Sequence, residues 1–89
     1  MIHELKTDPI PFPQSWNGDK LFEVRRDDRN YNLGDVLILK ETKYSGEAMS
    51  RGADLLYTGR QLTRIVTCKV CGVGYGIESG WCILGARKV

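Results

Sequence analysis

The chain has 89 residues and a mass of 10.1 kDa, with 42% hydrophobic residues, 27% charged residues and a net charge of +2. These values are typical of a single small globular domain, here spanning residues 1–89. The longest aliphatic run, Val36 to Leu39, is far too short to cross a membrane, and no apolar leader follows Met1. We therefore expect a cytoplasmic protein without a membrane partner, and the mild charge does not by itself require nucleic acid.

The N-terminal segment predicts a short strand followed by a short helix. Residues 3–6 alternate between apolar and polar types, which favours a strand. Residues 13–17 can form about one helical turn, because a proline stands near its start and Gly18 follows its end. Phe12 and Trp16 are four residues apart and would share one buried face of this helix.

Two further strands are expected before residue 40. Residues 20–25 alternate, which places Glu23 and Arg25 on one face and Lys20 on the other unless the start of the strand bends. Residues 36–39 are continuously apolar, as in a buried strand.

The C-terminal half predicts a long loop and two more strands. Residues 41–58 are polar and contain glycines, and we expect a long, partly mobile hairpin loop. Residues 61–70 alternate as a long strand in which Cys68 would be a small buried residue. Residues 72–80 are rich in glycine and predict a loop, and residues 81–86 predict the last strand. Short strands, glycine-rich turns and one or two short helices indicate an α+β, mainly β fold closed as a small barrel.

The three cysteines, Cys68, Cys71 and Cys82, are odd in number, and with no apolar leader after Met1 this argues against a disulfide framework. Cys68 and Cys71 have the spacing of a zinc knuckle, and Cys82 with His3 would complete four ligands. Structural zinc sites usually show two close-spaced ligand pairs, and the second pair is absent from this sequence. We therefore predict no metal and no cofactor.

The segment from Gly18 to Asp35 carries the most informative pattern. Gly18-x-Lys20-x-x-Glu23-x-Arg25 resembles the GxKxxExR signature of ASCH domains, which are small PUA-like β-barrels. The wider pattern resembles the DUF3850 family, which is placed with the ASCH and PUA-like proteins and is often met in phages. This resemblance covers nearly the whole chain and is weakest in residues 41–58. Its further segments are His3-x-Leu5-Lys6, Trp16 to Arg25, Asp28 to Tyr31 and Gly34 to Leu37.

The resemblance implies a cleft beside the barrel that binds RNA or a nucleotide. The expected binding residues are His3, Lys6, Lys20, Glu23, Arg25 and Arg29. Lysine and arginine neutralise phosphates, and a glutamate can orient an arginine or accept a hydrogen bond from a base or ribose. Trp16 or Tyr31 could offer a stacking surface, although core packing is the more ordinary role for Trp16.

Three alternatives stay open. Some ASCH relatives are amidohydrolases that act on acetylated cytidine and carry a threonine three residues after the lysine. In this sequence Glu23 stands at that position, so the expected nucleophile is missing. Hydrolysis would then depend on a Lys20–Glu23 acid–base pair. A phage-type protein-interaction module would use the 41–58 loop as its contact surface. The charges could also be structural, as an edge strand that deters aggregation or as a Glu23–Arg25 network that joins the barrel seam.

Overall fold

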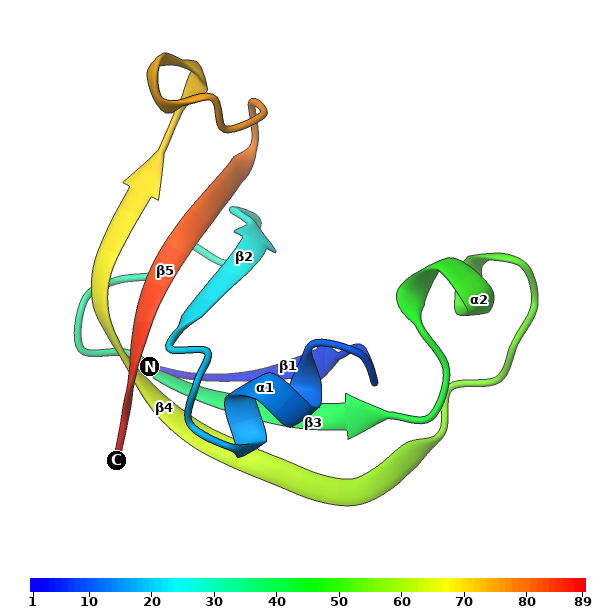
Figure 1. Cartoon of the computed structure of the whole chain (residues 1–89). Helices are drawn as coiled ribbons and strands as arrows, with labels where there is room; N and C mark the ends of the chain where they lie inside the picture. Colours follow the sequence, from blue (N-terminus) through cyan, green and yellow to red (C-terminus); the bar gives the residue numbers. More distant parts are fainter.

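The computed structural model describes the backbone of residues 1–89 and every side chain except that of Val73. In this described part, five strands and two short helices follow one another as β1, α1, β2, β3, α2, β4 and β5 (Figure 1). The strands are β1 (Ile2–Thr7), β2 (Phe22–Arg26), β3 (Val36–Thr42), β4 (Tyr57–Cys71) and β5 (Trp81–Lys88). The helices are α1 (Phe12–Trp16) and α2 (Gly46–Ser50), and a 3₁₀ turn, Val73–Tyr75, lies between β4 and β5.

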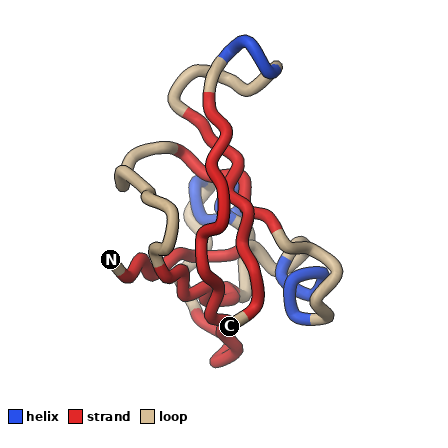
Figure 2. Tube along the Cα trace, turned by 90° about the vertical axis from the view of Figure 1, so that its left-hand side faces the viewer, coloured by secondary structure: helices blue, strands red, loops and turns tan.

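The strands form one curled sheet with the order β1-β3-β4-β5-β2. β1 runs parallel to β3, and the other neighbouring strands are antiparallel. β4 has 15 residues; its first half pairs with β3 and its second half with β5, so the sheet bends around this strand (Figures 1 and 2). The sheet is thus a half-barrel with β1 and β2 at its two edges. This confirms the predicted mainly β fold with short helices, but the predicted closure into a barrel is wrong, because β1 and β2 do not pair with each other.

The core lies on the inner face of this half-barrel. The alternating pattern of β1 buries every second residue, and β3 and β5 contribute Leu37, Leu39 and Leu84, which are at most 1% exposed. α1 inserts Phe12, which is fully buried, whereas Trp16 is 46% exposed. The prediction that both aromatic residues share a buried face is therefore wrong for Trp16.

A β-bulge in β4 reverses the predicted alternation. Val66 is opposite Ala86 and Cys68 is opposite Gly85, so Thr67 is an extra residue without its own partner. Beyond this point each side chain of β4 points to the other face, and Cys68 is exposed rather than buried as predicted. A Cβ atom on Gly85 would lie 2.5 Å from the Cys68 Sγ and 2.6 Å from the Thr67 Oγ1, which explains why glycine faces the bulge.

The polar stretch 41–58, predicted to be loop, is more ordered than expected. β3 continues to Thr42, β4 begins at Tyr57, and α2 lies between them in an arm at one side of the molecule (Figure 1). The Ser45 Oγ accepts a hydrogen bond from the Ala48 amide at 3.1 Å and caps α2. No helix in the described part of the chain is long and apolar enough to cross a membrane.

Candidate functional site

The two edges of the sheet border a pair of adjoining clefts. The larger has a volume of about 340 Å³ and the smaller about 160 Å³, and Lys6 and Arg25 line both. We call the pair the seam groove. Its charged lining residues are five cations, Lys6, Lys20, Arg25, Arg26 and Arg29, and three carboxylates, Asp8, Glu23 and Asp28.

Glu23 is the buried charge of the groove, with only 3% of its surface exposed. The Lys20 ammonium donates to the Glu23 Oε2 at 2.6 Å, and the Arg25 guanidinium donates to the Oε1 at 2.8 Å. Glu23 and Arg25 share a face as the alternation predicts. Lys20 reaches the same carboxylate because β2 begins only at Phe22, so Lys20 lies before the strand. Both oxygens of Glu23 are thus held by the protein's own cations.

Arginine side chains join the two edges of the half-barrel. The Arg25 Nη1 donates to the Lys6 carbonyl at 2.8 Å, and its Nη2 donates to the Thr7 Oγ1 at 3.1 Å. The Arg29 Nη1 donates to the Glu4 carbonyl at 3.2 Å. Glu4 and Lys6 are two residues apart, so their carbonyls point to the same open edge of β1. These bonds replace the backbone ladder that a closed barrel would have here.

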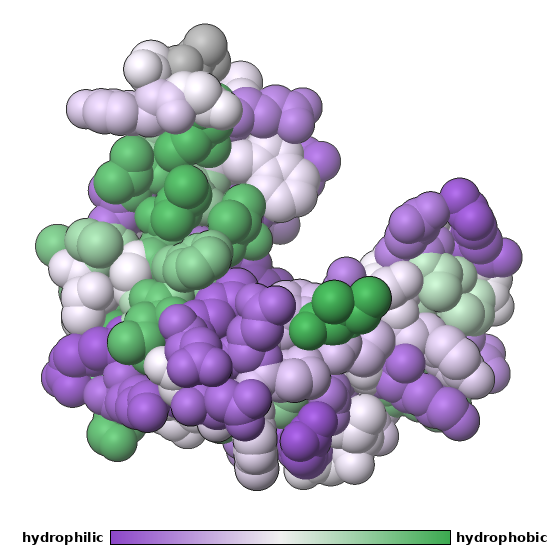
Figure 3. Space-filling model, in the orientation of Figure 1, coloured by the Kyte–Doolittle hydropathy of each residue, from purple (hydrophilic) through white to green (hydrophobic). Residues whose placement is uncertain are grey.

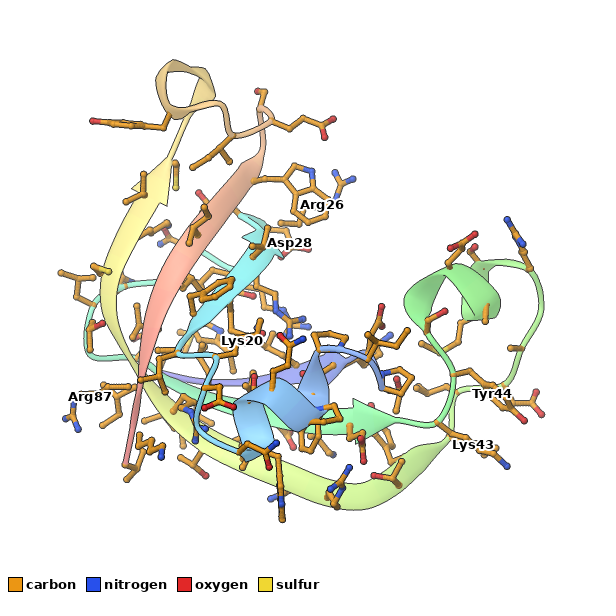
Figure 4. All side chains as sticks on the ribbon, in the orientation of Figure 1. Lys20, Arg26, Asp28, Lys43, Tyr44 and Arg87 are labelled. Atoms are coloured by element: carbon orange, nitrogen blue, oxygen red, sulfur yellow. The ribbon has the colours of Figure 1, made fainter. Side chains whose placement is uncertain are left out.

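Two other cations of the groove are available to a ligand. Lys6 and Arg26 are exposed, and neither belongs to an ion pair among the described side chains. The Arg26 guanidinium lies 5.2 Å from the centre of the Trp81 ring. Figure 4 shows Lys20 near the start of β2 and Arg26 toward its other end. Arg26 was not among the residues predicted from the sequence, because only the open edge of β2 brings it to the groove.

An apolar surface borders the groove on one side. Phe22, Val24 and Ile83 are 47%, 51% and 37% exposed, and Val24 also lines the larger cleft. Figure 3 shows apolar side chains gathered over β2 and β5, with hydrophilic side chains below them. The groove therefore presents cations beside an uncharged wall.

His3 lies outside the set that lines the seam groove. Its Nε2 lies 2.8 Å from the Asp35 Oδ2, its side chain is buried, and its ring packs edge-on against Tyr31. Asp35 also accepts from the Asn32 amide and from the N-terminal ammonium. These bonds, led by the one with His3, hold the pKa of Asp35 well below its usual range. The other five predicted residues, Lys6, Lys20, Glu23, Arg25 and Arg29, all line the groove.

The two aromatic residues considered for stacking have different environments. Tyr31 is 2% exposed and belongs to the core, and burial raises the pKa of its hydroxyl. Trp16 packs on Phe12, with 5.9 Å between the ring centres, and the Arg60 guanidinium lies 5.0 Å from its ring centre. Trp16 is therefore the more accessible of the two.

The four residues considered as zinc ligands do not form one site. Cys71 and Cys82 are opposite each other on the inner face, whereas Cys68 lies on the outer face of β4 and His3 is bound to Asp35. Among the described side chains, no group of three or more histidine, cysteine, aspartate or glutamate residues is placed to hold a metal ion.

A comparison with known proteins gives a family but no activity. No curated protein matches the chain. The model of one family, described as a domain of unknown function, matches residues 2–86 and so includes all five strands almost completely. The residues that line the seam groove all lie within this matched range. The chain therefore belongs to the DUF3850 family.

Proposed function

We propose that the seam groove binds RNA or a nucleotide through its phosphates, and that the half-barrel is a PUA-like domain of the ASCH type. The observation that carries the proposal is the position of Lys6. Lys6 lines both clefts and is exposed, and among the described side chains no carboxylate is paired with its ammonium. An unpaired cation between further cations is suited to an anionic ligand.

The remaining features of the groove support a phosphate-bearing chain over a simple anion. Cations line both clefts, so more than one phosphate can be contacted along the seam. The apolar wall at Val24 offers contact for a ribose or a base. Tyr31 lines the smaller cleft but is only 2% exposed, and Trp16 lies outside the lining of both clefts, so neither ring offers a base an open stacking surface and we expect weak sequence preference.

The test is a fluorescence-anisotropy titration of a labelled, mixed-sequence, single-stranded RNA over a salt series. Lys6→Ala should weaken binding roughly fivefold and lower the salt slope by about 0.7, the loss of one phosphate contact. Lys43→Ala is the control, because Figure 4 shows Lys43 beside the α2 arm, far from Lys20 and Arg26. The proposal fails if the wild-type protein does not bind at low salt, or if the control variant loses as much affinity as Lys6→Ala.

A hydrolase is less well supported by the geometry. The candidate acid–base pair, Lys20 and Glu23, is joined at 2.6 Å, and Arg25 occupies the second carboxylate oxygen. A substrate would have to displace one of these cations before Glu23 could act as a base or nucleophile.

The runner-up is a protein-interaction module centred on the α2 arm. Three consecutive apolar residues of this arm, Leu55, Leu56 and Tyr57, are each more than 40% exposed. Replacing residues 46–54 with a short turn should leave RNA affinity unchanged if the arm serves a protein partner. A loss of RNA affinity in that variant would instead extend the RNA site to the arm.

A further inference from the structure

Two cysteines face each other across the end of the β4–β5 hairpin. Cys71 and Cys82 are directly opposite residues of these antiparallel strands. Opposite residues in such a pair project from the same face, with their Cα atoms about 4.5–5.5 Å apart. Disulfide-bonded cysteines have Cα atoms about 4.4–6.8 Å apart. The register therefore places both thiols at a spacing that a disulfide accepts.

The surroundings confirm that both side chains point to the inner face. The Lys69 ammonium, two residues before Cys71, donates to the Asp27 carboxylate at 2.9 Å and to the Tyr31 carbonyl at 3.0 Å. The Cys71 Sγ itself lies 4.0 Å from the other Asp27 oxygen. Without the bulge at Thr67, Cys71 would point outward, so the same irregularity that exposes Cys68 creates this pair.

We propose that Cys71 and Cys82 are a thiol–disulfide exchange site that forms a reversible intramolecular disulfide with a small disulfide as oxidant, such as oxidised glutathione. The Cys71 thiolate attacks one sulfur of the oxidant and releases the first small thiol, leaving a mixed disulfide on Cys71. The Cys82 sulfur then loses its proton and attacks the Cys71 sulfur, which releases the second small thiol. The two protein thiols lose two electrons and two protons, and the oxidant gains them as two thiols.

The two cysteines have different parts in this exchange. Cys71 is exposed and meets the oxidant first, whereas Cys82 is fully buried. Burial raises the pKa of Cys82 to about 11, with smaller contributions from Asp27 and Cys71, while Lys69 lowers it. Two more ionisable groups lie close to Cys82, namely Tyr31 and, opposite Cys82 on β2, Arg25. Ring closure should therefore be the slow step, and it should accelerate as the pH rises.

The disulfide would constrain the conformation of the glycine-rich turn between β4 and β5. It would close a loop from residue 71 to residue 82, which includes the 3₁₀ turn. Closing a loop of this length reduces the entropy of the unfolded chain and should raise Tm by roughly 10 °C.

The experiment incubates the intact, reduced protein with excess oxidised glutathione at neutral and at alkaline pH. The products are then alkylated and measured by intact mass and peptide mapping, with Tm recorded for each form. Three variants are compared with the wild-type protein: Cys71→Ser, Cys82→Ala and Cys68→Ser. Cys68 is the matched control, since it is exposed on β4 but on the opposite face.

We expect the wild-type protein and Cys68→Ser to lose two hydrogen atoms and to yield a linked 71–82 peptide pair. Cys71→Ser should lose this product, and Cys82→Ala should stop at the mixed disulfide. The proposal is overturned if oxidation links Cys68, yields only glutathione adducts or dimers at both pH values, or lowers Tm. A lower Tm would mean that the bond forms only in an opened hairpin, contrary to the native register.

Discussion

Replacing Glu23 with glutamine tests whether the charges of the seam support the fold. The amide keeps the shape of the side chain but leaves the Lys20 and Arg25 cations without their shared carboxylate, at 2.6 Å and 2.8 Å respectively. Removing one partner of a buried ion pair costs about 3–5 kcal/mol. The Lys20 and Arg25 side chains are 13% and 20% exposed, so some solvent reaches them and we expect a somewhat smaller loss, about 2–4 kcal/mol.

The assay is urea denaturation followed by tryptophan fluorescence, together with a thermal melt. A loss of this size should lower Tm by at least about 10 °C in a domain of 89 residues. Glu47→Gln is the matched control, because its pair with Arg51 has a similar length, 2.7 Å, but side chains that are 73% and 77% exposed. The control should change stability by less than about 0.5 kcal/mol. If the two variants lose equal stability, burial does not decide the strength of the Glu23 pairs and the reasoning is refuted.

The same variant separates binding from hydrolysis. Loss of a negative charge from a groove lined by five cations should raise affinity for RNA by roughly two- to fivefold wherever the protein remains folded. A hydrolase that used Glu23 would instead keep its ligand and lose turnover. A fall in RNA affinity at a temperature well below Tm would contradict the binding proposal.

Three further substitutions test the fold and its pH dependence. Asp35→Asn should make the free energy of unfolding less dependent on pH in the acid range. The depressed pKa of the Asp35 carboxyl contributes stability that is present above about pH 4 and is lost as the pH falls further. Urea midpoints measured across the acid range test this prediction. Gly85→Ala should destabilise by about 1–3 kcal/mol, because its Cβ would meet Cys68 and Thr67, and adding Cys68→Ala should recover part of the loss in thermal melts. Leu37→Ala should cost about 2–5 kcal/mol in urea denaturation, because Leu37 is fully buried in the core; a midpoint within error of wild type would place the core elsewhere.

The positions of the strands could be predicted because each has a local apolar pattern. Val36–Leu39 is an example, since its continuous apolar run coincides with the centre of β3. The extension of β3 to Thr42 had no such signal. Glu41 is buried there because Arg60, across the hairpin, binds its carboxylate at 2.9 Å and holds its pKa below the usual range. From the sequence alone, a polar residue such as Glu41 that is buried by a distant partner cannot be told from a loop residue.

Most members of the candidate site were expected from the family resemblance, but its connections were not. Lys20, Glu23 and Arg25 line one groove, although the alternation along the strand placed only Glu23 and Arg25 on the same face. His3 does not line the groove and Arg26 was missed. The bonds from Arg25 to Lys6 and Thr7 depend on two edge strands meeting in space, which no local pattern encodes. The bulge at Thr67 was missed for a related reason, because one unpaired residue reverses the faces without changing the composition of the strand.

The structure also decides which residues can report on binding. The Arg25 guanidinium donates hydrogen bonds to Glu23, to the Lys6 carbonyl and to Thr7. Arg25→Ala should therefore open the seam between β1 and β2 and lower both the stability of the protein and its affinity for RNA. Lys6 contributes only its backbone carbonyl to that network, so Lys6→Ala should lose affinity while its urea midpoint stays within error of wild type. Equal loss of stability in the two variants would mean that the Lys6 side chain also supports the seam. Under the proposed RNA binding, the arginine that joins the two edges of the half-barrel would serve affinity and stability at once. A cation outside that network, such as Lys6, is therefore the one whose replacement separates the two effects.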